Sequence, residues 1–218
     1  MITRVEDRLF AACGIAFVLL ELVGFALGGD THQLTVTSGM TKIADTLATP
    51  AGSLSWVGAY LDLLGFGAFL AFAVWACAKL GGGLLGQVGR AAGTSYVALS
   101  VASLAVQDTI AYRAGHGLST QLARTLVTAN EALFVGSWFL IAFFLLAAGA
   151  LALGAARRAL GWSALGIALF TLVTTAISVN NLGQLSILLF FAWTLAASIA
   201  LGRGKRTSAS AAAVAQHA

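Results

Sequence analysis

The chain has very few charged residues. It is 218 residues long, and 9% of them are charged while 59% are hydrophobic. Because a soluble domain carries about 25% charged residues, this deficit excludes an ordinary soluble fold and predicts a multi-pass membrane protein. The net charge of +4 comes from 12 basic and 8 acidic residues. The basic excess falls in loops and the tail, which indicates contact with a lipid bilayer and its anionic lipids rather than with nucleic acid.

Cysteine and metal-binding patterns are also scarce. The two cysteines are Cys13 and Cys77, and both fall near helix ends predicted to be cytoplasmic. A disulfide is not expected there, so we interpret both as small buried hydrophobic residues. The chain contains no Cys-x-x-Cys pair and no His/Cys cluster, so no metal site is predicted.

Several cofactor and catalytic motifs are missing. His32, His116 and His217 lie outside the apolar segments, which argues against a bis-histidine haem site. No lysine lies inside an apolar segment, as a retinal Schiff base would require. The phosphate-binding loop, the His-Glu-x-x-His motif and Gly-x-Ser-x-Gly are absent as well. No cofactor is therefore expected.

Six apolar segments are long enough to cross a bilayer, which takes about 20 residues. The first continues past Glu21, too long for a signal peptide, so it is expected to be retained. The third is the least apolar, and we expect it to lie centrally, surrounded by other helices. Residues 1–202 are thus predicted to form an all-α integral membrane bundle of six transmembrane helices. The segments are 9–29, 53–78, 91–112, 130–153, 159–179 and 182–202.

Basic residues predict the orientation of the bundle. If the N-terminus is cytoplasmic, nine basic residues lie inside and three outside, as the positive-inside rule requires. Both termini are therefore predicted to be cytoplasmic. The inner set is Arg4, Arg8, Lys79, Arg90, Arg157, Arg158, Arg203, Lys205 and Arg206, and the outer set is Lys42, Arg113 and Arg124.

Two outer connections and the tail have distinct patterns. Residues 30–52 predict a short surface helix, capped by Ser38, with Met40, Ile43 and Leu47 at helical spacing and a stop at Thr49-Pro50. Residues 113–129 predict a second one, through Leu118, Leu122 and Leu126. The basic, Ala/Ser-rich residues 203–218 are predicted to be a disordered cytoplasmic tail. Arginine outnumbers lysine and Ala, Gly and Leu dominate, which is typical of a GC-rich bacterial genome.

Four carboxylic acids lie within or at the edge of the first four apolar segments, and no Lys or Arg lies inside any of them. They are Glu21, Asp62, Asp108 and Glu131. An ionisable group in hydrocarbon is costly and usually faces a bundle interior or a wet cavity. Without a buried cation, these acids must be protonated, share a proton or hold a cationic partner.

Glu21 and Asp62 are the strongest candidates. At 1.5 Å per residue they lie roughly 12 and 14 Å from the outer ends of their segments, so they occupy one level. Asp62 shares its helix face with Gly58, Ala59, Gly65 and Phe66, and Glu21 shares its face with Gly14, Gly24 and Phe25. Small residues let another helix approach, so both faces are predicted to point into the bundle. The alternative is that both acids are structural hydrogen-bonding groups between helices.

The other two acids have local explanations. Thr128-Ala-Asn-Glu131 is a capping box, so Glu131 is predicted to satisfy a helix N-terminus. Asp108 is close in sequence to Tyr112 and Arg113 and is expected either to pair there or to join Glu21 and Asp62 as a catalytic acid.

Two stripes of polar side chains predict a polar interior. One is Tyr96, Ser100, Ser103 and Gln107, and the other is Thr171, Thr174, Thr175 and Ser178, ending at Asn180-Asn181. Trp138 lies seven residues after Glu131, on the same face. Ordinary packing of Ser and Thr between membrane helices is the alternative. The predicted ligand-binding residues are therefore Glu131, Tyr96, Ser100, Ser103, Gln107, Trp138, Thr175 and Asn180.

Three features resemble an uncharacterised six-helix bacterial membrane family called domain of unknown function 4386. They are the glycine-interrupted first segment (Gly14, Gly24), the Gly-Ala-Tyr-Leu-Asp stretch at 58–62, and Arg-Arg-Ala-Leu-Gly-Trp-Ser-Ala-Leu-Gly from 157 onward. The resemblance implies a helical bundle and supplies no activity.

Three functions fit these features. The first is binding or translocation of a small molecule or cation, with Glu21 and Asp62 as coordinating or proton-carrying groups. The second is an intramembrane enzyme in which one of these acids protonates an apolar substrate, as membrane-bound terpene cyclases do. The third is a non-catalytic subunit of a membrane complex.

Overall fold

The computed structural model describes residues 4–28, 34–177 and 180–203. All regular secondary structure in this part of the chain is α-helix, with no strand, which confirms the predicted all-α class. Most of the predicted tail lies outside the described residues, as do Ser178 and the side chain of Asn181. The helices are α1 Arg4–Leu27, α2 Met40–Ala48, α3 Ser53–Leu80, α4 Gly83–Arg113, α5 Thr120–Gly154, α6 Arg158–Ala176 and α7 Asn180–Gly202.

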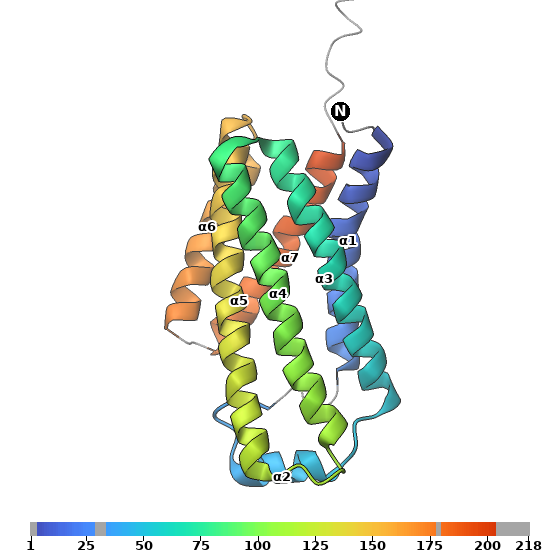
Figure 1. Ribbon diagram of the computed structural model, residues 1–218. Coiled ribbons are helices and arrows are strands. Elements are labelled where there is room, and N and C mark those ends of the chain that lie inside the picture. The colour runs from blue at the N-terminus through green and yellow to red at the C-terminus, as the bar shows by residue number, and fades with distance from the viewer. Residues whose placement is uncertain (1–3, 29–33, 178–179, 204–218) are drawn as a thin grey trace, which may run out of the picture.

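The six long helices form a closed ring. Each packs against its neighbour in chain order, from α1 to α3 and on to α7, and α7 packs back against α1 (Figure 1). Within the ring, α3 also reaches α5 and α7. Both ends of the described chain lie at the same end of the bundle, at the top of Figure 1.

Five of these helices are long and apolar enough to cross a membrane: α1, α3, α5, α6 and α7. The chain is therefore a membrane-embedded helical protein. Helix α4 falls short in hydropathy because it carries several polar residues, of which Tyr96, Ser100 and Ser103 are buried. It lies in the ring between α3 and α5, touches α2, and reaches α7 through the ring contact of Tyr96 with Phe190 at 6.1 Å. The expected central position of this segment is wrong, because one buried face is enough to shelter its polar groups.

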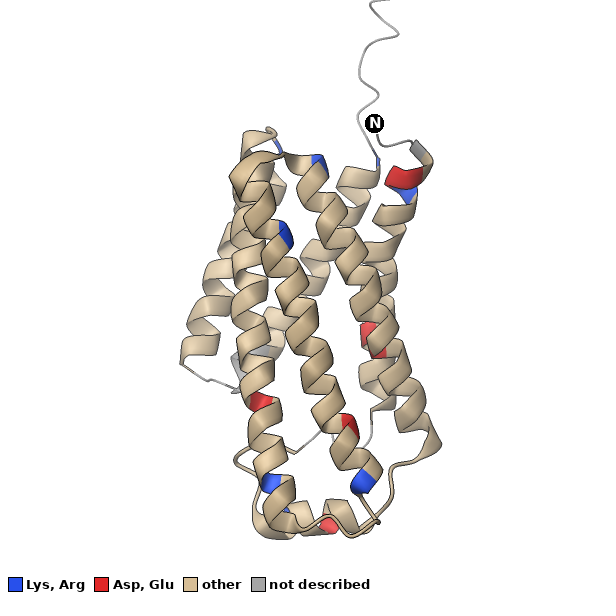
Figure 2. Cartoon of the chain, viewed as in Figure 1, with Lys and Arg blue, Asp and Glu red and all other residues tan. Residues whose placement is uncertain are grey.

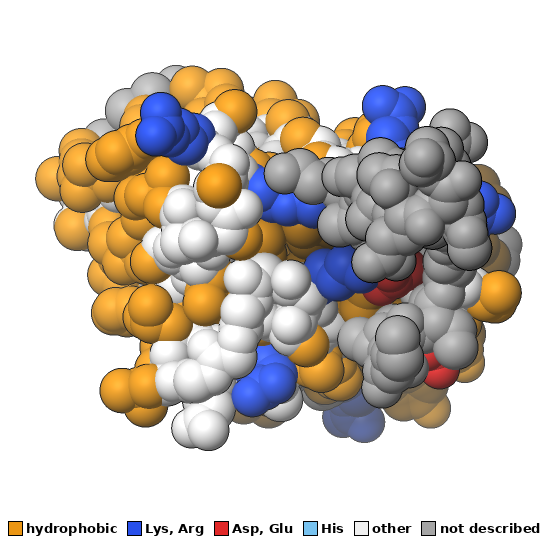
Figure 3. All heavy atoms as spheres, turned by 90° about the horizontal axis from the view of Figure 1, so that it is seen from above, with side chains coloured by type: hydrophobic (Ala, Val, Ile, Leu, Met, Phe, Trp, Pro, Cys, Tyr) orange, Lys and Arg blue, Asp and Glu red, His pale blue; other side chains and the backbone are white. Residues whose placement is uncertain are grey.

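Basic and acidic residues are distributed differently along the length of the bundle. Figure 2 shows Lys and Arg near the two ends, whereas carboxylates also occur well inside the lower half. The end that carries the termini is the more basic, and Figure 3 shows Lys and Arg side chains spread over it. On α1 and α3, Asp7 accepts hydrogen bonds from Lys79 Nζ, at 2.5 Å, and from Trp75 Nε1, at 3.0 Å. This contact ties the two helices together at that end.

At the opposite end, α4 and α5 are longer than a bilayer requires. Helix α5 has 35 residues, about 52 Å at 1.5 Å per residue, against a hydrocarbon core of about 30 Å. Helix α2 packs on these ends through Ile43 and Leu47, forming a second core (Figure 1). The predicted short helix is therefore confirmed. Its last residue is Ala48 and its C-cap is Thr49, which agrees with the predicted stop at Thr49-Pro50. Its N-cap is Gly39 rather than Ser38, because the Ser38 hydroxyl accepts from Thr35 N instead.

The second predicted surface helix is not a separate element. Helix α5 begins at Thr120 and continues without interruption, and Ser119 caps it by accepting from Leu122 N at 3.3 Å. The capping box at Thr128–Glu131 is therefore wrong, because both residues lie inside the helix. The Thr128 hydroxyl donates to Arg124 O, and Glu131 is free to bond elsewhere.

The half of the bundle nearer the termini is densely packed with phenylalanine. We call Phe17, Phe69, Phe72, Phe144 and Phe190 the aromatic cluster; each is fully buried. Phe69 contacts the other four rings at centroid distances of 4.9 to 6.2 Å. Since lipid is as apolar as these side chains, the cluster stabilises the fold through close packing rather than removal from water.

Candidate functional site

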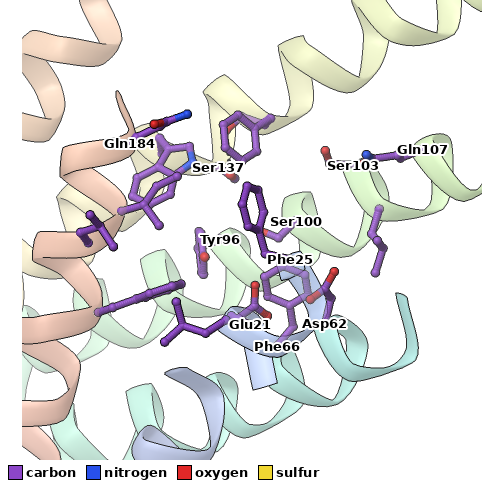
Figure 4. A pocket seen from close by; sticks show the side chains of 17 residues that line it. Glu21, Phe25, Asp62, Phe66, Tyr96, Ser100, Ser103, Gln107, Ser137 and Gln184 are labelled. Carbon is purple, nitrogen blue, oxygen red and sulfur yellow. Dashed lines mark hydrogen bonds between the residues drawn. The ribbon is translucent and has the colours of Figure 1, made fainter. Parts of the chain in front are cut away.

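A cavity of about 400 Å³ opens immediately beside the aromatic cluster, in the half of the bundle away from the termini (Figure 4). Five helices line it, and α6 does not. Among the described residues, the lining contains no Lys, Arg or His. Its polar members are Glu21 of α1, Asp62 of α3, Tyr96, Ser100, Ser103 and Gln107 of α4, Ser137 of α5 and Gln184 of α7, and its apolar members are Leu22, Phe25, Phe66, Leu104, Phe134, Trp138, Ile187, Leu188 and Phe191.

The two deepest acids meet in this cavity. Figure 4 shows the Glu21 and Asp62 carboxyl groups beside each other on one wall, close enough to interact electrostatically. Asp62 is 9% exposed. Glu21 Oε1 and Asp62 Oδ1 are buried and have no hydrogen-bond partner in the described ranges of the chain. Since buried polar groups are nearly always paired, these two oxygens are an exception that a bound partner would satisfy.

Glycines position the two acids reciprocally. The Asp62 carboxyl of α3 rests on Gly24 of α1, and the Glu21 carboxyl of α1 rests on Gly65 of α3. A Cβ atom at Gly65 would lie 2.6 Å from Glu21 Oε1. The backbones of α1 and α3 also come close together at Gly58, where a Cβ atom would lie 2.9 Å from Gly24 O. The predicted inward face of Asp62 and the packing role of Gly24 are both confirmed.

The polar stripe of α4 forms the facing wall. All four of its members line the cavity (Figure 4). Ser103 also donates to Asn130 Oδ1 at 2.6 Å, which joins α4 to α5. Tyr96 packs edge-on against Phe66, Phe69 and Phe190, so it connects the cavity to the aromatic cluster. Trp138 completes this side, as predicted.

Three other predicted site residues lie outside the lining of the cavity, and the side chain of a fourth lies outside the described part of the structure. Glu131 Oε2 accepts from Val36 N at 2.8 Å and so holds the segment before α2 against α5. Asp108 lies within electrostatic range of Asp62 but outside the lining. Thr175 lies on α6, which contributes nothing to the cavity. Asn180 begins α7, and its side chain lies outside the described part of the structure.

Two of these placements have simple geometric reasons. Asp108 and Arg113, both described, form no ion pair, because residues five apart on a helix do not face each other. On α6, Thr174 faces α7 instead of the cavity. Its hydroxyl lies 2.9 Å from the Ser186 hydroxyl of α7. For Thr174, the helix-packing alternative that the sequence left open therefore holds.

Ser137 and Gln184 were missed as cavity residues. Ser137 shares a helix face with Phe134 and Trp138 at spacings i, i+3 and i+4, so the periodicity of α5 carried the signal. Gln184 is the single glutamine in the last apolar segment. Polar side chains in such segments mark pathways and sites, so its type was the signal.

Metal binding is not supported by the donor set. No group of three His, Cys, Asp or Glu side chains occurs among the described residues. Both cysteines are free, as predicted, and Cys77 packs its sulfur on Gly89. What the site offers is a pair of anionic or proton-holding groups, several hydroxyls and an aromatic wall.

Comparison with known proteins does not assign the chain to a family. No protein-family profile, curated protein or solved structure matches the chain. The resemblance to domain of unknown function 4386 therefore stays a prediction.

Proposed function

We propose that this chain binds a small cationic molecule in the acid-lined cavity, as the binding step of a proton-coupled transporter. One observation carries the proposal. Within the described part of the chain, Glu21 Oε1 and Asp62 Oδ1 are buried beside each other without hydrogen-bond partners, and the cavity lining there supplies no basic side chain. A cationic ligand would supply the missing charge and hydrogen bonds, and its departure would leave protons as replacements.

We also propose a topology for the chain in the membrane. The ring of six long helices crosses the bacterial cell membrane six times, with α4 protected from lipid by its neighbours. Both termini are cytoplasmic, in keeping with the basic end described above. The cavity then belongs to the outer half of the membrane. The aromatic cluster separates it from the cytoplasm, so transport requires that cluster to rearrange.

A second candidate function follows from the aromatic lining. Phe25, Phe66 and Trp138 line the same cavity as the acids, and aromatic faces stabilise cations. A protonated acid in such a cavity would donate its proton to an alkene or epoxide, and the aromatic faces would stabilise the carbocation formed. This hypothesis predicts turnover of an apolar terpenoid substrate, whereas the first predicts reversible binding of a cation.

The test compares ligand binding in single amide variants. Ethylammonium is titrated against purified wild-type protein in nanodiscs, and against Glu21→Gln and Asp62→Asn. We expect each variant to lose at least about tenfold in affinity, since tenfold corresponds to about 1.4 kcal/mol and a charge-assisted hydrogen bond is worth that much. The matched control is Asp45→Asn, an exposed acid on α2, which should bind as the wild type does. Equal affinity in all four proteins would contradict the proposal.

A further inference from the structure

Lining residues of both α1 and α7 are exposed, so we place the mouth of the cavity between these two helices. The two helices pack closely at the level of the aromatic cluster, where Phe17 of α1 contacts Phe190 and Phe191 of α7 at 5.8 and 5.5 Å. In Figure 1, α7 then runs diagonally away from α1 toward the lower end of α6. Neighbours in the ring therefore separate at the level of the cavity.

Side chains at this mouth belong to both the cavity and the outside. Leu22 and Phe25 of α1 and Leu188 of α7 line the cavity, and they are 46%, 77% and 57% exposed. Both flanking helices are candidate membrane spans. An opening between two spans faces hydrocarbon rather than water. These three rim residues are apolar, while Gln184 of α7, which is also exposed and lines the cavity, adds an amide.

The carboxyl groups lie deeper than this rim. The Glu21 and Asp62 oxygens that lack a partner among the described residues are buried, and Ser100 and Ser103 of α4 line the same cavity (Figure 4). A molecule that fills the site from the side would place a charged or donor-rich end at the acids and an apolar end at the mouth.

We propose that the ligand is an amphiphile with an ammonium head group, which enters from the bilayer between α1 and α7. This inference rests on the proposed function and names its ligand class and route. The ammonium head contacts Glu21 and Asp62, and the alkyl tail lies between Leu22 and Leu188. The bilayer concentrates such a molecule, so tail length raises apparent affinity through partitioning rather than through new contacts.

The experiment uses the full chain in phosphatidylcholine nanodiscs, with empty nanodiscs as the partitioning blank. Three probes are compared: octylammonium, ethylammonium and octanol. We expect octylammonium to bind about a hundredfold or more tightly than ethylammonium, because each added methylene strengthens partitioning into the bilayer. Octanol, which lacks the charge, should not bind.

The route is tested by narrowing the mouth. Leu188→Trp should slow octylammonium association about tenfold, and should slow association of the shorter ethylammonium less, since a gate alters access before chemistry. Leu22→Phe is the second, milder variant, should the first fold poorly. The matched control is Leu169→Trp on α6, which is 63% exposed and remote from the cavity, and it should match the wild type.

The outcomes separate the two proposals. If octylammonium binds equally fast in wild type, Leu188→Trp and Leu22→Phe, while Glu21→Gln still weakens it, the lateral route is wrong and cation binding stands. If octanol binds as well as octylammonium, the ammonium head group is wrong. If none of the three probes binds the wild type, cation binding fails and this inference fails with it.

Discussion

The two halves of the bundle use the same helices in opposite ways. Toward the termini, α1, α3, α5 and α7 fill the interior with the aromatic cluster, and every ring is fully buried. Away from the termini, the same helices leave a cavity of about 400 Å³ and bury carboxyl oxygens without partners. One half is packed for stability, and the other keeps carboxyl oxygens that have no partner among the described residues and that a ligand or protons would satisfy. The predictions below test this division, from the largest expected effect on stability to the smallest.

The aromatic cluster should be the most sensitive region. Phe69→Ala removes the ring at the centre of the cluster and should lower the free energy of unfolding by about 3–5 kcal/mol. Phe25→Ala, at the rim of the cavity, should change it by less than about 0.5 kcal/mol, as surface substitutions do. Thermal unfolding in detergent measures both. Equal losses of stability would show that the two halves are not different.

The close crossing of α1 and α3 should come next. Gly58→Val places a side chain against backbone atoms that cannot move aside, so overpacking should cost about 2–3 kcal/mol. Gly67→Val on the same helix meets nothing within 4 Å and is the matched control. Similar melting temperatures for the two variants would contradict the close crossing.

The contact between Glu131 and the segment before α2 should matter less. Glu131→Ala removes the acceptor for Val36 N and should cost about 1 kcal/mol, typical of one hydrogen bond. Hydrogen exchange should become faster at Val36, while ethylammonium affinity stays at the wild-type value. A loss of affinity would return Glu131 to the binding site, where the sequence had placed it.

The smallest effect on stability should accompany a large effect on binding. Ser100→Leu fills cavity space and should change the free energy of unfolding by less than about 1 kcal/mol, because the cavity has room for the added atoms. Ligand binding should be lost. Ala98→Leu, exposed on the same helix, should retain it. If Ser100→Leu reduces folded yield instead, Ser100 is a packing residue.

Much of the fold followed from one-dimensional patterns. Six apolar runs gave the six long helices to within a few residues for most ends, and the spacing of Ile43 and Leu47 gave α2. Helix α5 was predicted too short, because a helix that continues beyond the bilayer has ordinary soluble periodicity there. Glu131 was misassigned for the same reason. A capping box is a local pattern, and its meaning depends on whether the chain is already helical.

The site was predictable where residue type and depth sufficed. Glu21, Asp62 and the stripe of α4 are all in the cavity, since each is polar within an apolar run. Thr175 was misplaced because Ser and Thr serve both packing and binding, and only the ring order shows that α6 faces α7. The reciprocal seating of the acids on Gly65 and Gly24 depends on how α1 and α3 cross, which no spacing along one helix encodes.

The central claim is that the ligand contacts Glu21 and Asp62. Infrared difference spectroscopy, recorded as octylammonium is added to the protein in nanodiscs, measures this directly. We expect a carboxyl difference signal in the wild type that shrinks in Glu21→Gln and in Asp62→Asn and disappears in the double variant, with Asp45→Asn unchanged. The same carboxyl signal in wild type and double variant would contradict the account and leave the two acids as structural groups between helices.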